Sequence, residues 1–423
     1  MDNRVKKKLT KSGKGAYSIY IPKKWLDSWL EEQKKKKEVY LLELDEHLLL
    51  SPVIKESKKR LSVDLKTTQE IRTLLLSSYV RGYQEVEIHS ERKFTNEQIS
   101  EARGYIRLLD ENLQVVANDN CISYKSRNIE NKIDYSELFG NLFQKTVEVL
   151  ELVSELLHFY DLNPQRAVHL IRMINCVEEE DIDRIAFHIF RQMANLEMPF
   201  ESFIDLEFFG LVVDILERIG DTCIGIAGLV CDIYGIDRNH MHYPLEILEK
   251  EVGTKDISIP DNLEELKNIY IQAIKEGCVY LNACRDTVMK RDGLTAYCLK
   301  RETMNTRRKV ETQIFEAVSR LLEEARKESN GKDKKEKRIR DKELKDTKKS
   351  MSNTLYVYQI GYRIRELINY IEGLAKRACL VYYCETMPED ITQTTTQTKR
   401  KDEIRDKLCN LEDKSKDKSC IQN

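Results

Sequence analysis

The chain has 423 residues, of which 34% are charged and 41% are hydrophobic, with only 16 Gly and 7 Pro. This length allows two to four domains, and the composition predicts long helices with charged outer faces. The net charge of −2 hides a basic amino end, because residues 1–60 carry sixteen Lys and Arg against nine Asp and Glu, a net of plus seven. We therefore expect a polyanionic partner to bind near the amino end.

The cysteines and the apolar segments exclude several protein classes. The eleven cysteines form no C-x-x-C pair, which argues against a zinc site or a disulfide framework and favours a reducing compartment. The first residues run into Lys6, Lys7 and Lys8 without an apolar segment behind them, so no signal peptide is expected. The most apolar stretch, 208–236, is interrupted by charged residues and fails as a membrane span. The sequence predicts a cytoplasmic protein with no membrane insertion.

The amino end, residues 1–55, reads as a small β domain. Short alternating segments predict strands, and Gly13 with Gly15 marks a turn between the first two. Residues 56–130 read as a small α/β connecting unit in which helix, strand, helix and strand follow one another. The expected segments of that unit are 67–82, 83–90, 95–110 and 113–125.

From residue 131 onward the sequence predicts long helices. Segments with a period of 3.6 residues fall into two groups of three, which is typical of a duplicated three-helix bundle. The first group, within 131–245, comprises 135–160, 163–195 and 203–235; the second, within 255–385, comprises 261–289, 293–326 and 352–384. The lysine-rich insertion 326–350 is expected to be a helix tip or a disordered loop, and the tail 386–423 to be disordered. The expected fold is α+β and mostly α.

Two acidic pairs are the main candidate for a functional site. Glu179 with Asp183 and Glu217 with Asp221 are each four residues apart, which places each pair on one helical face. Asp214 adds a third acid one turn before Glu217. Packed side by side, the two helices would gather these oxygens into a patch suited to Mg, Ca, Mn or iron. The other interpretation, which stays open, is a charged helical face in contact with water.

The amino-terminal segment KKLTKSGKGAYSIYIPKKW, from Lys7 to Trp25, resembles the AbrB/SpoVT-like DNA-binding domain. That resemblance implies a barrel made from swapped hairpins of two chains, and therefore a homodimer bound to DNA. The lysines expected to contact phosphates are Lys7, Lys8, Lys11, Lys14, Lys23 and Lys24. The stretch EEQKKKKEVY, from Glu31 to Tyr40, departs from the glycine-containing turn usual in that family.

The helical part resembles PhoU, the regulator of phosphate uptake, whose two bundles carry E/D-x-x-x-D motifs. ERIGD, from Glu217 to Asp221, matches the E-R-I-x-D form, and Glu179 to Asp183 matches its partner. The resemblance implies a possible divalent metal (iron, Mn, Mg or Zn) on the first bundle. The second bundle departs from the pattern because it reads YRIRE, from Tyr362 to Glu366, and offers only Glu302 and Glu311 on its middle helix. Any metal is therefore expected on the first bundle alone.

Together these features predict a DNA-binding regulator of phosphate uptake and homeostasis. The alternative is an adaptor that docks on a phosphate ABC transporter or a histidine kinase without sequence-specific DNA binding. A metal-dependent hydrolase is chemically conceivable, but no nucleophile arrangement, phosphate loop or dinucleotide motif is present, and no enzyme is expected. His188, five residues after Asp183, lies off the acidic face and is expected to be packed or solvated rather than a ligand.

Overall fold

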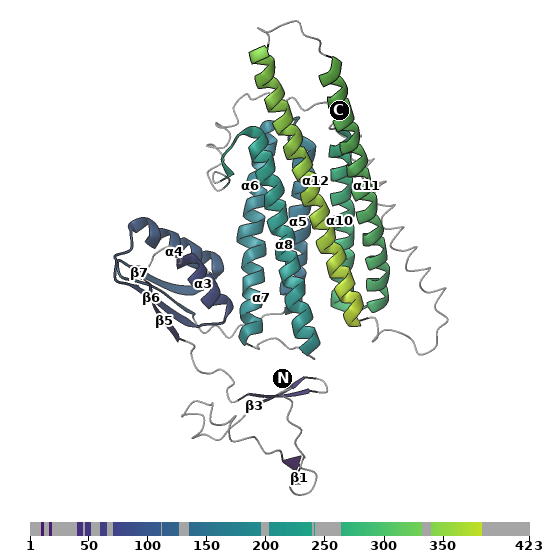
Figure 1. The fold of residues 1–423 in the computed structure, drawn as a ribbon. Helices are drawn as coiled ribbons and strands as arrows, with labels where there is room; N and C mark the ends of the chain where they lie inside the picture. Colours follow the sequence, from purple (N-terminus) through teal and green to yellow (C-terminus); the bar gives the residue numbers. More distant parts are fainter. Residues whose placement is uncertain are drawn as a thin grey trace, which may run out of the picture.

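The computed structural model describes twelve parts of the chain. These are residues 10–11, 17–18, 40–44, 47–51, 60–65, 71–110, 112–126, 135–195, 203–238, 241, 264–331 and 340–382. Within them the protein is mostly helical, with a small four-stranded sheet near the amino end (Figure 1). This coarse architecture agrees with the α+β, mostly α prediction.

The amino end contains two short antiparallel strand pairs. β1 (Thr10–Lys11) pairs with β2 (Tyr17–Ser18), and β3 (Tyr40–Leu44) pairs with β4 (His47–Ser51). Lys11 is part of β1. The other lysines predicted to bind DNA, Lys7, Lys8, Lys14, Lys23 and Lys24, lie outside the described residues.

The connecting unit is a four-stranded sheet with two helices. In chain order its elements are β5 (Arg60–Leu65), α3 (Ile71–Val80), β6 (Glu85–Ser90), α4 (Asn96–Leu109), β7 (Leu113–Asn118) and β8 (Cys121–Ser126). The strand order is β5-β6-β8-β7, with β5 parallel to β6 and the other neighbours antiparallel. α4 begins with a capping box in which Thr95 and Gln98 satisfy each other's backbone N–H groups. Fourteen buried side chains, among them Leu75 and Ile106, form a core separate from that of the long helices.

The structure corrects the predicted connecting unit at both ends. The segment predicted as one final strand is the hairpin β7–β8, because the Asn118 side chain accepts hydrogen bonds from the backbone N–H groups of Asn120 (3.1 Å) and Cys121 (2.9 Å) and so forms a tight turn. β5 was not predicted. It contributes only six residues, and its place in the sheet depends on its pairing with β6.

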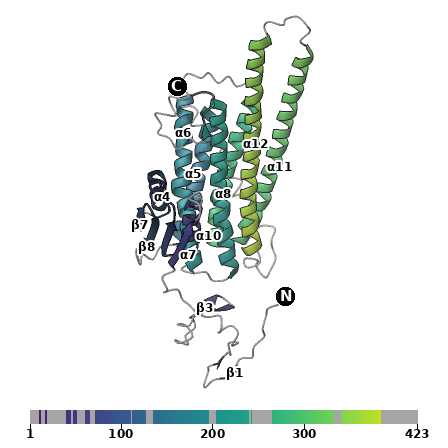
Figure 2. The ribbon, with the colours of Figure 1, turned by 60° about the vertical axis from the view of Figure 1, so that its left-hand side comes forward.

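The long helices form two groups that stand side by side (Figures 1 and 2). The first helical group contains α5 (Tyr135–Phe159), α6 (Pro164–Cys176), the π-helical turn η2 (Val177–Ile182), α7 (Asp183–Asn195) and α8 (Phe203–Tyr234). The second helical group contains α10 (Glu264–Lys290), α11 (Gly293–Gly331) and α12 (Arg340–Tyr382). These elements lie where the 3.6-residue period predicts them, and helix extends into both ends of the 326–350 insertion.

One continuous apolar core joins the two helical groups. α5 packs on α10, and α8 packs on α12, so each group covers the apolar face of the other. A buried ion pair reinforces this contact: Lys267 Nζ of α10 lies 2.7 and 2.9 Å from the carboxylate oxygens of Asp161, at the end of α5. No helix in the described part of the chain is long and apolar enough to cross a membrane.

Candidate functional site

The acidic segment of the first helical group lies on a π-helical turn. Residues Val177–Ile182 form η2, and the backbone N–H of Asp183 donates to the carbonyl oxygen of Glu178, five residues earlier. In an α-helix the partner would be four residues away, so this widened turn brings Glu178 over Asp183. The sequence prediction used a period of 3.6 residues throughout, and it therefore chose Glu179 and missed Glu178.

Glu178 is the most buried acid of the cluster, with only 2% of its surface exposed. It packs against α8 at Gly220, where an added Cβ would lie 3.1 Å from Glu178 Cγ and 3.4 Å from Ile182 side-chain atoms. The absence of a side chain at Gly220 thus lets η2 approach α8 closely. This close approach faces Glu178 toward the second predicted acidic pair, Glu217 and Asp221.

The four facing acids, Glu178, Asp183, Glu217 and Asp221, are called the carboxylate cluster below. Burial, together with the charges of Asp183 and Asp221, raises the pKa of Glu178 to about 9. Burial, together with the charges of Glu217 and Asp221, raises the pKa of Asp183 to about 7. Burial and the charge of Asp221 likewise raise the pKa of Glu217 to about 7. The carboxylates therefore repel one another and favour a proton or a cation among them.

Burial also raises the pKa of Asp221, while a hydrogen bond with Glu178 acts in the opposite direction. A carboxyl group can donate to a neighbouring carboxylate only when it is protonated. These pKa shifts favour a protonated Glu178 beside an ionised Asp221. Without a cation, one proton held between two helices relieves part of the repulsion.

Nearby bases bind other acids instead of the carboxylate cluster. Arg218 contacts Asp214 through two hydrogen bonds of 2.9 and 3.3 Å, so Asp214 is paired with a base, and its charge still helps to raise the pKa of Glu217. Lys145 lies 3.0 Å from Asp181, on the other side of η2. Among the described residues, no Lys or Arg forms an ion pair with any of the four cluster acids. Glu179 lies beside the cluster and accepts a hydrogen bond of 3.5 Å from the Asn175 amide.

The cluster offers the donor atoms that a hard divalent cation prefers. Its ligands would be carboxylate oxygens from η2, α7 and α8, and one of them, Asp183 Oδ1, is buried without a hydrogen-bond partner. Within the described parts of the chain, no three acidic, His or Cys side chains are close enough together to hold a metal ion. The residues fit a divalent cation by their chemistry, and binding would draw the carboxylates closer together.

The connecting unit contacts the first helical group one turn beyond the cluster. His188 of α7 lies with Nδ1 3.1 Å from the Tyr79 hydroxyl and Nε2 3.3 Å from the Gln192 amide nitrogen, and burial lowers its pKa. His188 is therefore packed at this interface. The buried Arg191 donates to the backbone carbonyls of Tyr79 (3.0 Å) and Tyr83 (2.9 Å) and stacks over the Tyr79 ring. These contacts fix α3 and the turn after it to α7.

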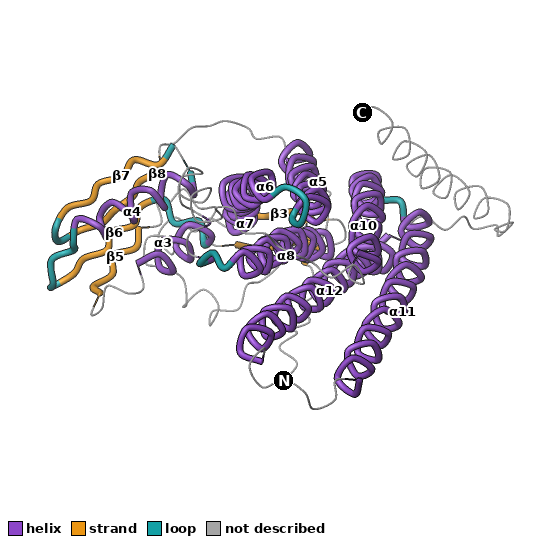
Figure 3. The backbone as a smooth tube through the Cα atoms, turned by 90° about the horizontal axis from the view of Figure 1, so that it is seen from above, coloured by secondary structure: helices purple, strands orange, loops and turns teal. Residues whose placement is uncertain are grey.

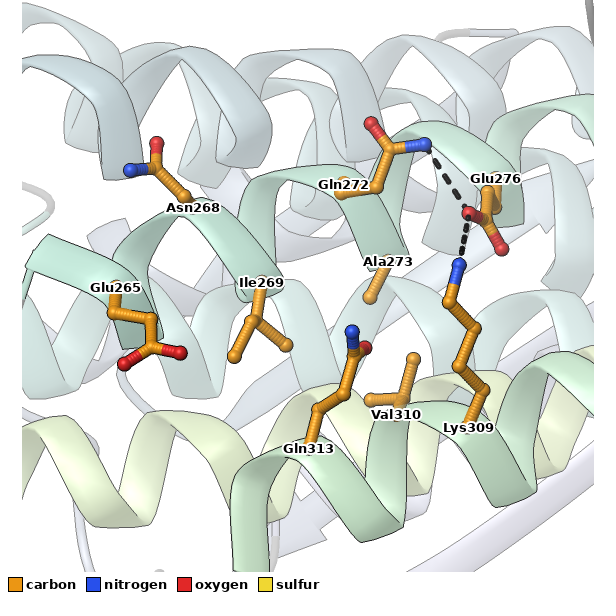
Figure 4. Close-up of a pocket in the computed structure, with 9 residues that line it drawn as sticks. All are labelled: Glu265, Asn268, Ile269, Gln272, Ala273, Glu276, Lys309, Val310 and Gln313. Carbon is orange, nitrogen blue, oxygen red and sulfur yellow. Dashed lines mark hydrogen bonds and ion pairs between the residues drawn. The ribbon is translucent and has the colours of Figure 1, made fainter. Parts of the chain in front are cut away.

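A separate groove of about 430 Å³ lies between α10 and α11 in the second helical group (Figure 4). Its centre is apolar, while Gln272 and Lys309 both approach the Glu276 carboxylate, at 3.1 and 3.9 Å. The lining residues are Glu265, Asn268, Ile269, Gln272, Ala273, Glu276, Lys309, Val310 and Gln313. No predicted site residue is among them. The groove lacks the converging buried polar groups that mark a small-molecule site.

The chain was compared with known protein families and with curated proteins. No protein-family model matches this chain, and no curated protein shows a significant match to it.

Proposed function

We propose that this chain is a DNA-binding regulator of phosphate uptake whose first helical group binds a divalent cation. The observation that carries the proposal is the carboxylate cluster, where acids of two helices with raised pKa values face one another without an ion-paired base among the described residues. The ERIGD and EEEDID segments that build it are the ones that resemble PhoU. The two helical groups correspond, in this proposal, to the tandem PhoU-like bundles.

A bound cation would neutralise repelling charges on η2, α7 and α8 at once. Its chemical contribution is charge neutralisation, and the carboxylates supply the ligands. Because α7 also holds the connecting unit through Arg191 and His188, a change in the packing of α7 on α8 would reach α3 directly. The connecting unit precedes the helical groups and follows the basic amino end, so it is the physical link between the cation site and DNA.

DNA binding is assigned to the basic amino end, residues 1–55. In this proposal, the lysines of the predicted hairpin neutralise phosphates, and its glycines let the backbone approach the duplex. Swapped hairpins from two chains make the protein a cytoplasmic homodimer in this proposal. Base-specific contacts then come from the paired domain as a whole, since phosphate contacts alone carry no sequence information.

The experiment that tests this function is fluorescence anisotropy of the full chain on DNA. The probes are the region upstream of its own phosphate-transporter genes and a scrambled duplex of equal length, over a range of salt concentrations. We expect tighter binding to the upstream DNA and a steep loss of affinity with salt. The triple variant Lys7→Ala/Lys8→Ala/Lys23→Ala should weaken binding to both duplexes and flatten the salt dependence.

Equal binding to both duplexes, or no binding, would contradict the regulator proposal. The function would then be that of an adaptor for a phosphate ABC transporter or a sensor kinase. Arg60→Ala is a suitable control, because that side chain is already paired with Glu87 at 2.7 Å and lies in the connecting unit.

A further inference from the structure

α7 faces the connecting unit with one stripe of side chains. Asp183, Phe187 and Arg191 follow one another at intervals of four residues, so they lie on one side of the helix. Phe187 packs against the apolar core of the connecting unit. Arg191 donates to the carbonyl oxygens of Tyr79 and Tyr83, at and beyond the end of α3. Asp183, the first member of the stripe, is therefore turned toward the connecting unit as well as toward the carboxylate cluster.

Arg72 of α3 has the matching place on the other side of this contact. It precedes Tyr79 by seven residues, close to two turns, so both side chains lie on one face of α3, which packs on α7 (Figure 1). Asp183 precedes Arg191 by eight residues, a little more than two turns of α7. The same step along both helices thus leads from the contact of Arg191 with Tyr79 to Asp183 and Arg72. Burial and the neighbouring acids raise the pKa of Asp183, and the positive charge of Arg72 acts in the opposite direction.

Tyr105 of α4 holds the Arg72 side chain in this position. The guanidinium carbon of Arg72 lies 4.7 Å from the centroid of the Tyr105 ring, which is a cation–π contact. Burial raises the pKa of Tyr105, Arg72 lowers it, and the charge of Asp183 raises it, so the three side chains lie together. Among the described residues, no acid is within ion-pair distance of Arg72. Its charge therefore acts on the cluster as a whole and is not taken up by a closed ion pair.

A guanidinium near the carboxylate cluster has two opposite effects. Without a cation, its positive charge offsets part of the repulsion among the acids and attracts the start of α3 toward α7. With a divalent cation bound, the same charge repels the cation and lowers its affinity. The cation and Arg72 therefore compete for the negative charge of Asp183. The connecting unit takes part in this competition because it carries Arg72.

We propose that Arg72 is a built-in competitor of the cation, through which the connecting unit sets the cation affinity of the carboxylate cluster. The inference rests on the cation site of the proposed function and adds the regulation of that site. Arg191 and His188 attach the end of α3 to α7, whereas Arg72 is attracted at its start only while no cation neutralises Asp183. Cation binding then loosens the start of α3, and by reciprocity a movement of Arg72 away from Asp183 tightens cation binding.

The test is the affinity of the full chain for Mn²⁺, measured by isothermal titration calorimetry at low ionic strength. Arg72→Gln should bind Mn²⁺ about threefold to tenfold more tightly than the parent, because the repelling charge is removed. Arg72→Lys keeps the charge and should bind as the parent does. A side chain that only supported the packing of α3 would not give tighter binding when it is shortened.

The matched control is Arg107→Gln, which removes an equal charge from the same unit. Arg107 is exposed and follows Tyr105 by two residues, so it lies on the other side of α4. Because solvent and salt screen that charge, Arg107→Gln should bind Mn²⁺ as the parent does. Tighter binding by Arg72→Gln but not by Arg107→Gln supports the proposal.

A second measurement needs no cation. In the presence of a chelator, Arg72→Gln should lower the urea concentration at the midpoint of unfolding, because the acids lose a compensating charge. The same change should lower it less in Asp183→Asn, where the partner charge is already absent. An equal effect in both backgrounds would reduce Arg72 to a packing role and overturn the proposal.

The calorimetry separates failure of this inference from failure of the cation site. Mn²⁺ binding by the parent, with equal or weaker binding by Arg72→Gln, would overturn the role of Arg72 and leave the cation site in place. No Mn²⁺ binding by the parent would overturn the cation site and this inference with it.

Discussion

The two helical groups have similar long helices but differ in how their acidic side chains are paired. In the second helical group, Glu372 pairs with Arg307 at 2.7 Å, Glu311 with Arg365 at 3.1 Å, and Glu366 with Arg363. In the first group, the four acids of the carboxylate cluster face one another instead (Figure 3 shows α7 beside α8). Between α11 and α12, arginine side chains neutralise the acids in ion pairs. Where η2 and α7 contact α8, protons or a cation are needed to neutralise the acids.

This difference in charge pairing explains why the E-R-I-x-D motif indicates a cation site in the first group only. The second group departs from E-R-I-x-D because Tyr362 stands where the first group has Glu217, and Arg365 stands where it has Gly220. Each arginine supplies the positive charge that a cation would otherwise supply. The comparison therefore predicts opposite responses to the same kind of substitution in the two groups.

The largest expected effect is on cation binding. Glu217→Gln with Asp221→Asn removes two of the four cluster charges, and we expect Mn²⁺ to bind about 100-fold more weakly, a loss of about 2.7 kcal/mol. Isothermal titration calorimetry of the full chain measures this affinity. The matched variant Glu311→Gln/Glu366→Gln in the second group should bind Mn²⁺ as the parent does. Equal affinity in all three proteins would mean that the cluster is only a solvated acidic face.

The next effect is on stability in the second group. Arg307→Ala removes the base that pairs with Glu372, while Glu311 keeps Arg365, and we expect a loss of about 1–2 kcal/mol in the free energy of unfolding. Chemical denaturation with urea measures it. Arg308→Ala, at an exposed neighbouring position, should change stability by less than about 0.5 kcal/mol. A loss of similar size at both positions would show that the ion pairs do not stabilise the α11–α12 contact.

The stability of the folded protein is expected to depend on pH because of the carboxylate cluster in the first group. In the folded protein the pKa values of Asp183 and Glu217 rise to about 7 and that of Glu178 to about 9. A raised carboxyl pKa contributes stability that is fully present below the ordinary value, which for glutamate is 4.5, and is lost as pH rises through the folded-state value. In the presence of a chelator, the unfolding temperature should therefore fall from pH 5 to pH 9.

Glu178→Gln isolates the upper part of that pH window. The amide is neutral at every pH, so at pH 8 the free energy of unfolding of the variant should exceed that of the parent by about 1 kcal/mol or more. Its stability should also depend less on pH between 7 and 9. Glu180→Gln, an exposed position on the same turn, is the control. A parent protein whose stability does not change between pH 5 and pH 9 would contradict the raised pKa values.

The smallest expected effect is at Gly220. Gly220→Ala places a methyl group 3.1 Å from Glu178 Cγ, so Glu178 must shift by a few tenths of an ångström. The usual gain of about 0.5–1 kcal/mol from replacing a helical glycine should be largely cancelled, while Mn²⁺ affinity falls several-fold. Gly140→Ala is the matched control, since nothing lies within 4 Å of its added Cβ and the full stabilising gain is expected. Identical gains at both positions would show that Glu178 is free to move.

Most of the helical architecture could be predicted from the sequence. The long helical segments and most elements of the connecting unit follow local periodicity, and the structure has helix or strand at those positions apart from β5, the β7–β8 hairpin and the π-helical turn η2 within 163–195. The division of the helices into two bundles stays a prediction. The acidic pairs were also visible, because a spacing of four residues is itself a helical signal. The resemblance to PhoU and to AbrB/SpoVT-like domains, and the functions it implies, stay predictions.

The sequence by itself determined which segments are helical and which stretches are acidic or basic, since both properties depend on residues within one turn or one strand. Only the tertiary structure decided which acids face one another. The π-turn at η2 replaces Glu179 by Glu178 at the contact with Gly220, and Arg218 pairs with Asp214 beside the cluster. Neither feature can be predicted from the periodicity of the sequence, because one depends on packing against a helix that is distant along the chain and the other on a competing ion pair. Charge compensation between helices is a property of packing, and this is why similar acidic helices carry a repelling cluster in one group and closed ion pairs in the other.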